Sequence, residues 1–158
     1  LSYDIISIPT PEVTQVITSE RMNFDIGINN PFAVVGERIN PTGKKKLSRS
    51  LREGRLDMVC SMARNQQMHN AAVLDVNLGT DGIDELSMMK EAIKEITYTV
   101  DLPLCIDTGY VDVMEAALRI YPGRALINSV SAESFLIDSG SKLSIILLCS
   151  SVSEKFII

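Results

Sequence analysis

The 158-residue sequence contains no tryptophan, only one histidine and three cysteines, and these scarcities exclude several classes of protein. Cys60, Cys105 and Cys149 are odd in number, widely spaced and form no CxxC motif. This pattern favours buried thiols in a reducing, cytoplasmic compartment over a disulfide framework. With His69 as the only histidine, no Cys/His metal cluster can be assembled, so we expect no metal site.

Signals for several other functions are also missing. The phosphate-binding patterns GxGxxG and GxxxxGKS/T do not occur, and no Ser-His-Asp set can be drawn. Leu1–Thr10 lacks the basic start and apolar core of a signal peptide, and no run reaches the ~18 apolar residues of a membrane helix. The net charge of −5 argues against nucleic acid and membrane surfaces as partners. We interpret the one basic run, Lys44–Lys46, as a solvated loop in preference to a ligand site.

What the sequence does contain is an apolar run that recurs four times and ends each time in one or two polar residues. Runs of this kind are typical of buried parallel strands that deliver polar groups to their C-terminal ends. The four runs and their polar residues are FAVVGERINPTG with Glu37 and Asn40, AVLDVNLGT with Asp75 and Asn77, LPLCIDTG with Asp107, and RALINSVS with Asn128.

Helical patterns alternate with these runs, which predicts an α/β fold built of parallel βαβ units. The expected strands are Phe32–Arg38, Ala72–Asn77, Leu102–Asp107 and Ala125–Asn128, and the expected helices are Leu47–Met68 (interrupted near Gly54), Asp81–Tyr98 and Val111–Ile120. Asn70 falls where a helix ends in the left-handed conformation, and His69 beside it is interpreted as a partner of the helix dipole.

The two ends of the chain are less regular. Thr10-Pro11-Glu12 has the pattern of a helix start, so we expect a helix to about Glu20, followed by a linker over Asn23–Pro31. This divides the chain into an N-terminal helix and linker (1–31) and an α/β domain (32–158). Near the C-terminus, Glu133–Asp138 suits one helical turn and Leu143–Cys149 a fifth strand.

The polar strand ends form the candidate site. Because parallel strands end at one edge of a sheet, the six side chains are expected to converge. Mixed carboxylates and amides suit a flat heterocycle that presents several N–H donors and a few acceptors, whereas Mg²⁺ would favour carboxylates alone. For any single residue, capping of the following helix is an equally good interpretation. The six residues are Glu37, Asn40, Asp75, Asn77, Asp107 and Asn128.

Four segments also resemble a known family. VVGERINPTGKKKL, VLDVNLGTDG, LPLCIDT and YPGRALINSVSAE are similar, in the same order, to the pterin-binding (methyltetrahydrofolate) domain of cobalamin-dependent methionine synthase. They are also similar to the methyltetrahydrofolate:corrinoid/iron–sulfur protein methyltransferases. The resemblance covers about residues 32–133. It implies a TIM-like barrel that binds methyltetrahydrofolate and passes its N5-methyl group to cob(I)alamin carried on a separate domain or protein.

The resemblance also implies roles for single residues. Asp107 and Asn128 match the family's pterin-ring contacts, Glu37 and Asn40 match the polar pair of the first strand and loop, and Asp75 and Asn77 match the end of the second strand. The groups near N5 are expected on later strands, so the catalytic residues stay unknown.

The barrels of this family have about eight strands over roughly 250 residues, so the four or five strands here predict an incomplete barrel. Such a chain is expected to pair with a second copy through a sheet edge or to need further sequence. Two other interpretations stay open. One is a dihydropteroate synthase-like enzyme, although the loop NLGTDGIDE has no arginine for a diphosphate. The other is an inactive, truncated pterin-binding fragment.

Overall fold

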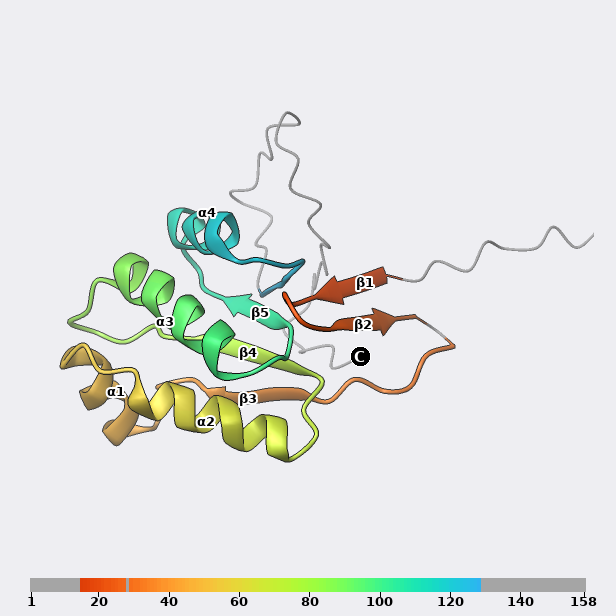
Figure 1. The fold of residues 1–158 in the computed structure, drawn as a ribbon. Helices are drawn as coiled ribbons and strands as arrows, with labels where there is room; N and C mark the ends of the chain where they lie inside the picture. The colour runs from red at the N-terminus through yellow and green to blue at the C-terminus, as the bar shows by residue number, and fades with distance from the viewer. Residues whose placement is uncertain (1–14, 28, 129–158) are drawn as a thin grey trace, which may run out of the picture.

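The computed structural model describes residues 15–27 and 29–128, and their centre is a four-stranded parallel sheet in the order β3-β4-β5-β6 (Figure 1). All four expected strands are present, each shorter at its start than the apolar run that contains it. Their bounds are β3 Val35–Ile39, β4 Val73–Asn77, β5 Leu104–Asp107 and β6 Leu126–Asn128. The expected α/β class with parallel βαβ units is confirmed, and the arrangement is consistent with part of a TIM-like barrel.

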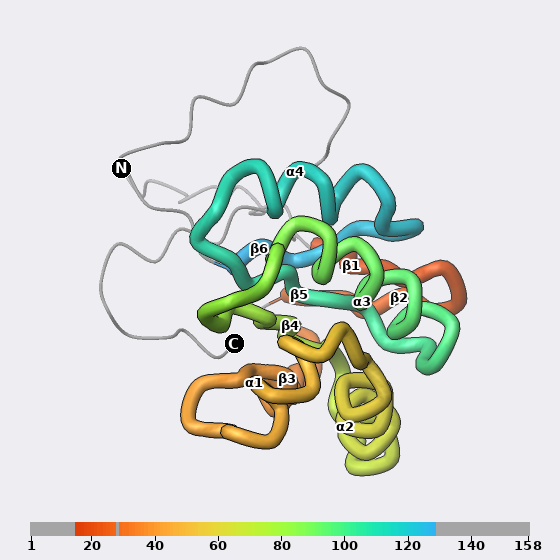
Figure 2. Tube along the Cα trace, turned by 90° about the vertical axis from the view of Figure 1, so that its left-hand side faces the viewer, coloured from red at the N-terminus to blue at the C-terminus, as the bar shows by residue number. Residues whose placement is uncertain are grey.

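Helices connect the strands and lie along one face of the sheet, as the view along the strands shows (Figure 2). The interruption expected near Gly54 is real, because Gly54 has φ +67 and separates two helices. Asn70 adopts φ 61 just after a helix end, again as expected. The helices are α1 Lys45–Arg52, α2 Asp57–Met68, α3 Glu85–Thr99 and α4 Val111–Ile120. No helix in the described ranges is long and apolar enough to cross a membrane.

The two faces of the sheet differ because side chains alternate along a strand. Leu74, Val76 and Ile106 point toward the helices and are fully buried in the larger core cluster. We call the opposite face the inner face. Val73 and Cys105 lie on it, near the beginnings of their strands, and belong to a smaller cluster. Polar side chains follow on the same face at the C-terminal ends of the strands.

The prediction of an N-terminal helix to Glu20 is wrong for the residues that the structure describes. From Gln15 the chain forms an antiparallel hairpin of β1 (Gln15–Thr18) and β2 (Asn23–Ile26). The β-branched residues Val16, Ile17 and Thr18 favour a strand. The segment has too few apolar positions to distinguish the period of 2 residues of a strand from the period of 3.6 residues of a helix. β2 also occupies Asn23–Ile26, the first four residues of the expected linker. The start of the expected helix, the turn at Glu133–Asp138 and the strand at Leu143–Cys149 lie outside the described residues.

The hairpin packs against the N-terminal end of the inner face. Ile17 is fully buried in the cluster with Val73, Cys105 and Leu126. The backbone of Thr18 exchanges two hydrogen bonds with Arg124, at 3.0 and 3.1 Å. The hairpin therefore closes the end of the sheet opposite to the polar strand ends. The division of the chain at residue 31 stays a prediction.

Candidate functional site

Four of the six predicted site residues lie together on the inner face, at the C-terminal ends of three neighbouring strands. Asn77, Asp107 and Asn128 occupy one level of the sheet, because Asn77 is in register with Asp107 and Asp107 with Asn128. Asp75 lies one step deeper on β4, beside Cys105. The convergence expected from the strand pattern is thus present in the structure for these four.

Hydrogen bonds join the four side chains into two amide–carboxylate pairs. The Asn77 Nδ2 donates to Asp107 Oδ2 at 3.0 Å, and the Asn128 Nδ2 donates to Asp75 Oδ1 at 3.4 Å. Asn77 is fixed further, since its Oδ1 accepts from the Gly79 N–H at 3.0 Å. Each pair sets an acceptor-only group beside a group that both donates and accepts. A planar ligand with adjacent N–H groups and a carbonyl could exchange partners with such pairs.

Asp75 is the most strongly perturbed of these groups. Its side chain is buried, with 3% of the residue exposed, and burial raises the pKa of the carboxyl from 3.8 to about 6. The charges of Asp107 and Glu37 raise the pKa further, while hydrogen bonds from Cys105 and Asn128 partly offset the effect. A carboxyl with a pKa this close to neutral, in a cluster of acids, is a frequent mark of a functional site.

The remaining two predicted residues come from β3 and its loop. Glu37 lies where the β3–β4 register shifts, between Gly36 and Ile39, and its charge acts on Asp75. Asn40 follows in the loop, where its Oδ1 accepts from the Thr42 N–H at 2.9 Å. The structure thus associates Glu37 with the site through its charge and places Asn40 at the adjacent loop.

The alternative that these residues cap helices is not supported where it can be examined. Asp84 caps α3 by accepting from the Ser87 N–H at 3.2 Å, whereas α1 and α4 begin at Lys44 and Tyr110 without a side-chain cap. None of the caps is a predicted site residue. For Asn128, the following segment lies outside the described residues.

Cys105 is a site neighbour that the sequence did not single out. Its buried thiol bonds to Asp75, and burial together with the adjacent carboxylates raises its pKa strongly. A thiol held protonated in this way is a poor nucleophile. Its position two residues before Asp107 on an alternating strand was the signal that could have identified it.

Thr108 is buried at the same edge and donates from Oγ1 to Glu85 Oε1 at 2.6 Å. Its Oγ1 also accepts from the Tyr110 N–H at 3.2 Å, so the loop after β5 is anchored to the start of α3. His69 lies elsewhere, exposed at the end of α2, with Nδ1 2.7 Å from the Asn65 carbonyl oxygen. This agrees with its interpretation as a helix-end residue.

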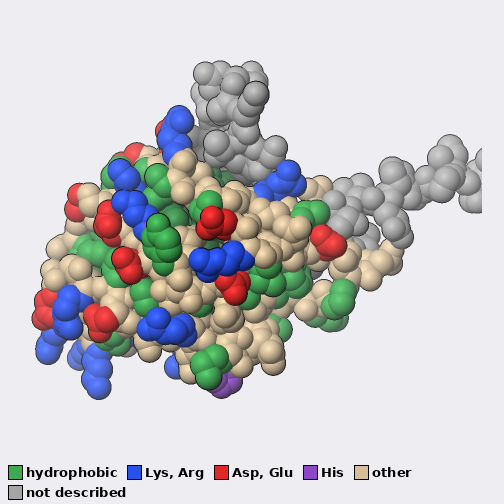
Figure 3. All heavy atoms as spheres, in the orientation of Figure 1, with side chains coloured by type: hydrophobic (Ala, Val, Ile, Leu, Met, Phe, Trp, Pro, Cys, Tyr) green, Lys and Arg blue, Asp and Glu red, His purple; other side chains and the backbone are tan. Residues whose placement is uncertain are grey.

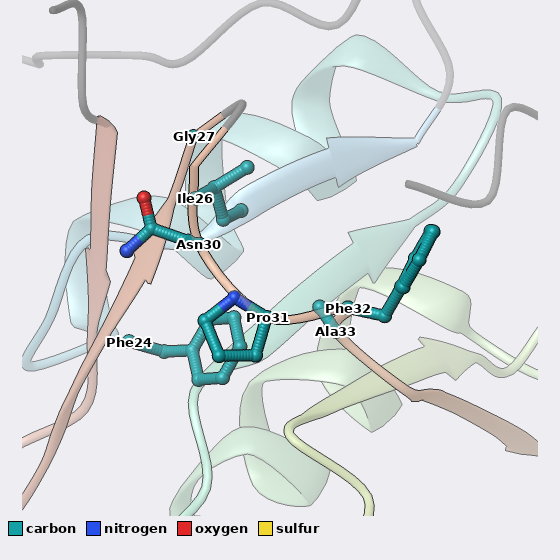
Figure 4. Close-up of a pocket in the computed structure, with 7 residues that line it drawn as sticks. All are labelled: Phe24, Ile26, Gly27, Asn30, Pro31, Phe32 and Ala33. Carbon is teal, nitrogen blue, oxygen red and sulfur yellow. The ribbon is translucent and has the colours of Figure 1, made fainter.

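Two further observations limit the chemistry. In residues 15–27 and 29–128, no three His, Cys, Asp or Glu side chains are arranged to hold a metal ion. A small hollow beside the hairpin has an apolar lining that includes Phe24, Ile26 and Pro31, while Phe32 projects from its rim and is 92% exposed (Figure 4). No ionisable side chain lines it, so it cannot supply acid–base chemistry.

Fold and site together define an α/β protein of parallel βαβ units that gathers amide and carboxylate side chains at the C-terminal ends of three neighbouring strands. The sequence profile of the family described as pterin binding enzyme matches residues 36–147, which is more than half of the chain. The chain belongs to this family, which includes methionine synthase, methyltetrahydrofolate:corrinoid methyltransferases and dihydropteroate synthase. Family membership implies a pterin substrate.

Proposed function

We propose that this chain binds methyltetrahydrofolate by its pterin ring and presents the N5-methyl group to a corrinoid carried on another domain or protein. The observation that carries the proposal is the two amide–carboxylate pairs on the inner face, made by Asn77 with Asp107 and by Asn128 with Asp75. The resemblance of the four motifs to methyltetrahydrofolate-binding domains supports this member of the family over the others.

The chemistry of the pterin edge suits these pairs. Its 2-amino-4-oxo-pyrimidine edge presents neighbouring N–H donors and a carbonyl acceptor. A carboxylate such as Asp107 can accept two adjacent N–H groups, and the amides of Asn77 and Asn128 can each donate to an oxygen or ring nitrogen. In the absence of ligand the pairs hold one another in place, so little side-chain entropy is lost on binding.

Methyl transfer from N5 requires an increase of positive character at that nitrogen and an accessible methyl group. In the proposal the described residues bind and orient the ring, and catalysis follows mainly from this positioning. The acceptor corrinoid would be bound by a partner domain or protein, and the groups that contact N5 are expected outside the described strands.

Dihydropteroate synthase-like activity is the second candidate and would require cationic groups for a diphosphate. The loop between β4 and α3 has no Lys or Arg. One observation keeps this candidate open, because Arg52 brings a cationic group to the loop. Its Nε donates to the Asp81 carbonyl oxygen there at 2.9 Å. The third candidate is a fragment that binds pterin without turnover.

One set of measurements separates the three candidates. Methyltetrahydrofolate is titrated into the chain by calorimetry, and the chain is then assayed with cob(I)alamin for methylcobalamin and with a dihydropterin diphosphate plus p-aminobenzoate for dihydropteroate. Saturable binding with methylcobalamin formation supports the proposal. Dihydropteroate formation supports the second candidate, and binding with neither product supports the third.

A further inference from the structure

An open hollow of about 330 Å³ lies at the start of α1, and its walls are rich in positive charge. Four cationic side chains line it, together with Ser48 and the Pro41–Gly43 loop; they are Lys44, Lys45, Arg49 and Arg52. No acidic residue is part of the wall. The lower left of the space-filling view shows Lys and Arg side chains at the α1 end of the molecule (Figure 3).

The charge of this hollow is not balanced within the described part of the chain. None of the four cations takes part in an ion pair there, and the nearby Glu53 instead pairs with Arg55. α1 also has no acidic residue in its first turn and no side-chain cap. Lys44 and Lys45 at the start of α1 oppose the helix dipole and cost stability, whereas Arg49 and Arg52 lie in its last turn and favour the dipole. Folding therefore does not explain the two lysines.

The hollow lies at the same end of the sheet as the candidate pterin site. The Lys44 Nζ donates to the Asn40 carbonyl oxygen at 2.9 Å, and Arg52 bonds to the Asp81 carbonyl oxygen. Asp81 is four residues beyond Asn77, so the two Cα atoms are at most about 14 Å apart. The hollow therefore lies by the loops that follow β3 and β4, at the C-terminal end of the sheet, where the two amide–carboxylate pairs are also found. Figure 1 shows the start of α1 at this end of the strands.

The arrangement of the cationic side chains favours binding of an extended anion over a compact one. Lys45, Arg49 and Arg52 are spaced i, i+4, i+7, so they line one face of α1 over about 10 Å. A single phosphate needs donors that converge on one point, whereas a row of exposed cations suits carboxylates that follow one another along a chain.

We propose that this hollow binds the γ-glutamyl tail of the folate substrate and so selects polyglutamylated folates. The inference rests on the proposed function, in which the pterin ring occupies the site on the inner face. The aminobenzoyl arm carries the tail away from the ring, and each glutamate adds a carboxylate that the cationic row can pair with. The interpretation of Lys44–Lys46 as a solvated loop is wrong for Lys45 and Lys46, which belong to α1. In the proposal, Lys44 and Lys45 contact the tail.

The test compares methyltetrahydrofolates that carry one or three γ-linked glutamates, titrated into the full chain at low and high salt. For the unaltered chain at low salt, we expect the triglutamate to bind about tenfold more tightly than the monoglutamate, because several exposed ion pairs add up. At high salt this advantage should be smaller, since the ion pairs are screened. In the Lys45→Ala/Arg49→Ala variant the advantage should fall to about twofold or less.

The matched control is Lys46→Ala/Arg64→Ala, which removes the same charges from exposed positions outside the hollow. It should retain the full triglutamate advantage. An equal advantage in all three proteins, or none in the unaltered chain, would overturn the inference even if the pterin binds normally.

A second arm separates this inference from the proposed function. p-Aminobenzoyl-tri-γ-glutamate carries the tail without the pterin, and inorganic pyrophosphate represents a compact anion. Saturable binding of the tail fragment that the Lys45→Ala/Arg49→Ala variant loses supports the tail site, even if no pterin ligand binds and the proposed function fails. Binding of pyrophosphate but not of the tail fragment would refute the tail site in favour of a diphosphate.

Discussion

Replacing Asp75 by asparagine should stabilise the protein at neutral pH and weaken its binding of pterin. The carboxyl is buried on the inner face, accepts from Asn128 and lies within the field of Asp107 and Glu37. Asparagine has the same shape and can still accept from Asn128, but it carries no charge to desolvate. In the proposed function, a pterin with N–H donors would favour the ionised form of Asp75 and offset this cost.

The size of the expected gain in stability follows from the pKa of Asp75, which rises from 3.8 to about 6 on folding. A rise of about two units corresponds to about 3 kcal/mol, because each unit is worth about 1.4 kcal/mol. Below pH 4 the Asp75 carboxyl is protonated in both the folded and the unfolded chain, so its burial does not lower the free energy of unfolding. Between about pH 4 and 6 the unfolded chain loses the proton first, so stability falls as pH rises and levels off above about pH 6.

The assay is urea unfolding of the unaltered chain and the Asp75→Asn variant from pH 4 to 8. The two free energies of unfolding should be similar at pH 4, and the variant should be up to about 3 kcal/mol more stable at pH 7. Asp25→Asn, at an exposed position of the hairpin, is the control and should show no such divergence. A constant difference across the pH range, or a less stable variant at pH 7, would refute the reasoning.

Four further outcomes are expected. Asp107→Ala should weaken methyltetrahydrofolate binding by about 1.5–3 kcal/mol in calorimetry, the value of a charged hydrogen bond, and unchanged affinity with an intact fold would contradict its assignment. Asn128→Asp removes an amide donor and sets a carboxylate against Asp75, so affinity and stability should both fall at pH 7, with stability recovering near pH 5 in urea titrations. Gly123→Ala places a methyl group against the backbone of the hairpin and should cost about 1–3 kcal/mol of stability, whereas Gly109→Ala, with open space around it, should cost less. Elemental analysis of the purified chain should find no stoichiometric zinc or iron, and either metal in a 1:1 ratio would contradict the metal-free prediction.

Much of the sheet could be predicted from the sequence because β4, β5 and β6 are largely buried on both faces. Such strands are continuous apolar runs, and the polar residues at their ends are visible as interruptions. Asp107 and Asn128 were predicted in this way, and the structure sets them in register. Gly54 and Asn70 were equally predictable, since each adopts a positive φ that few other residue types tolerate.

Other features depend on contacts that a linear pattern does not encode. The segment around Val16 and Ile17 is too short to separate helical from strand periodicity, and its pairing with β2 and Arg124 decides the outcome. The pairing of Asn77 with Asp107 and of Asn128 with Asp75 follows from register, which the sequence gives no means to fix. Cys105 resembled an ordinary core residue because its contact with Asp75 crosses between strands.

The most direct test of the central claim is to observe the site amides while the ligand binds. In a ¹⁵N-labelled chain titrated with methyltetrahydrofolate, the side-chain NH₂ resonances of Asn77 and Asn128 should shift together and saturate, because the pterin takes over their bonds to Asp107 and Asp75. The NH₂ of Asn65, exposed on α2, serves as the internal reference and should not move. Saturable binding that leaves Asn77 and Asn128 unshifted would contradict the assignment of the pterin site to the inner face.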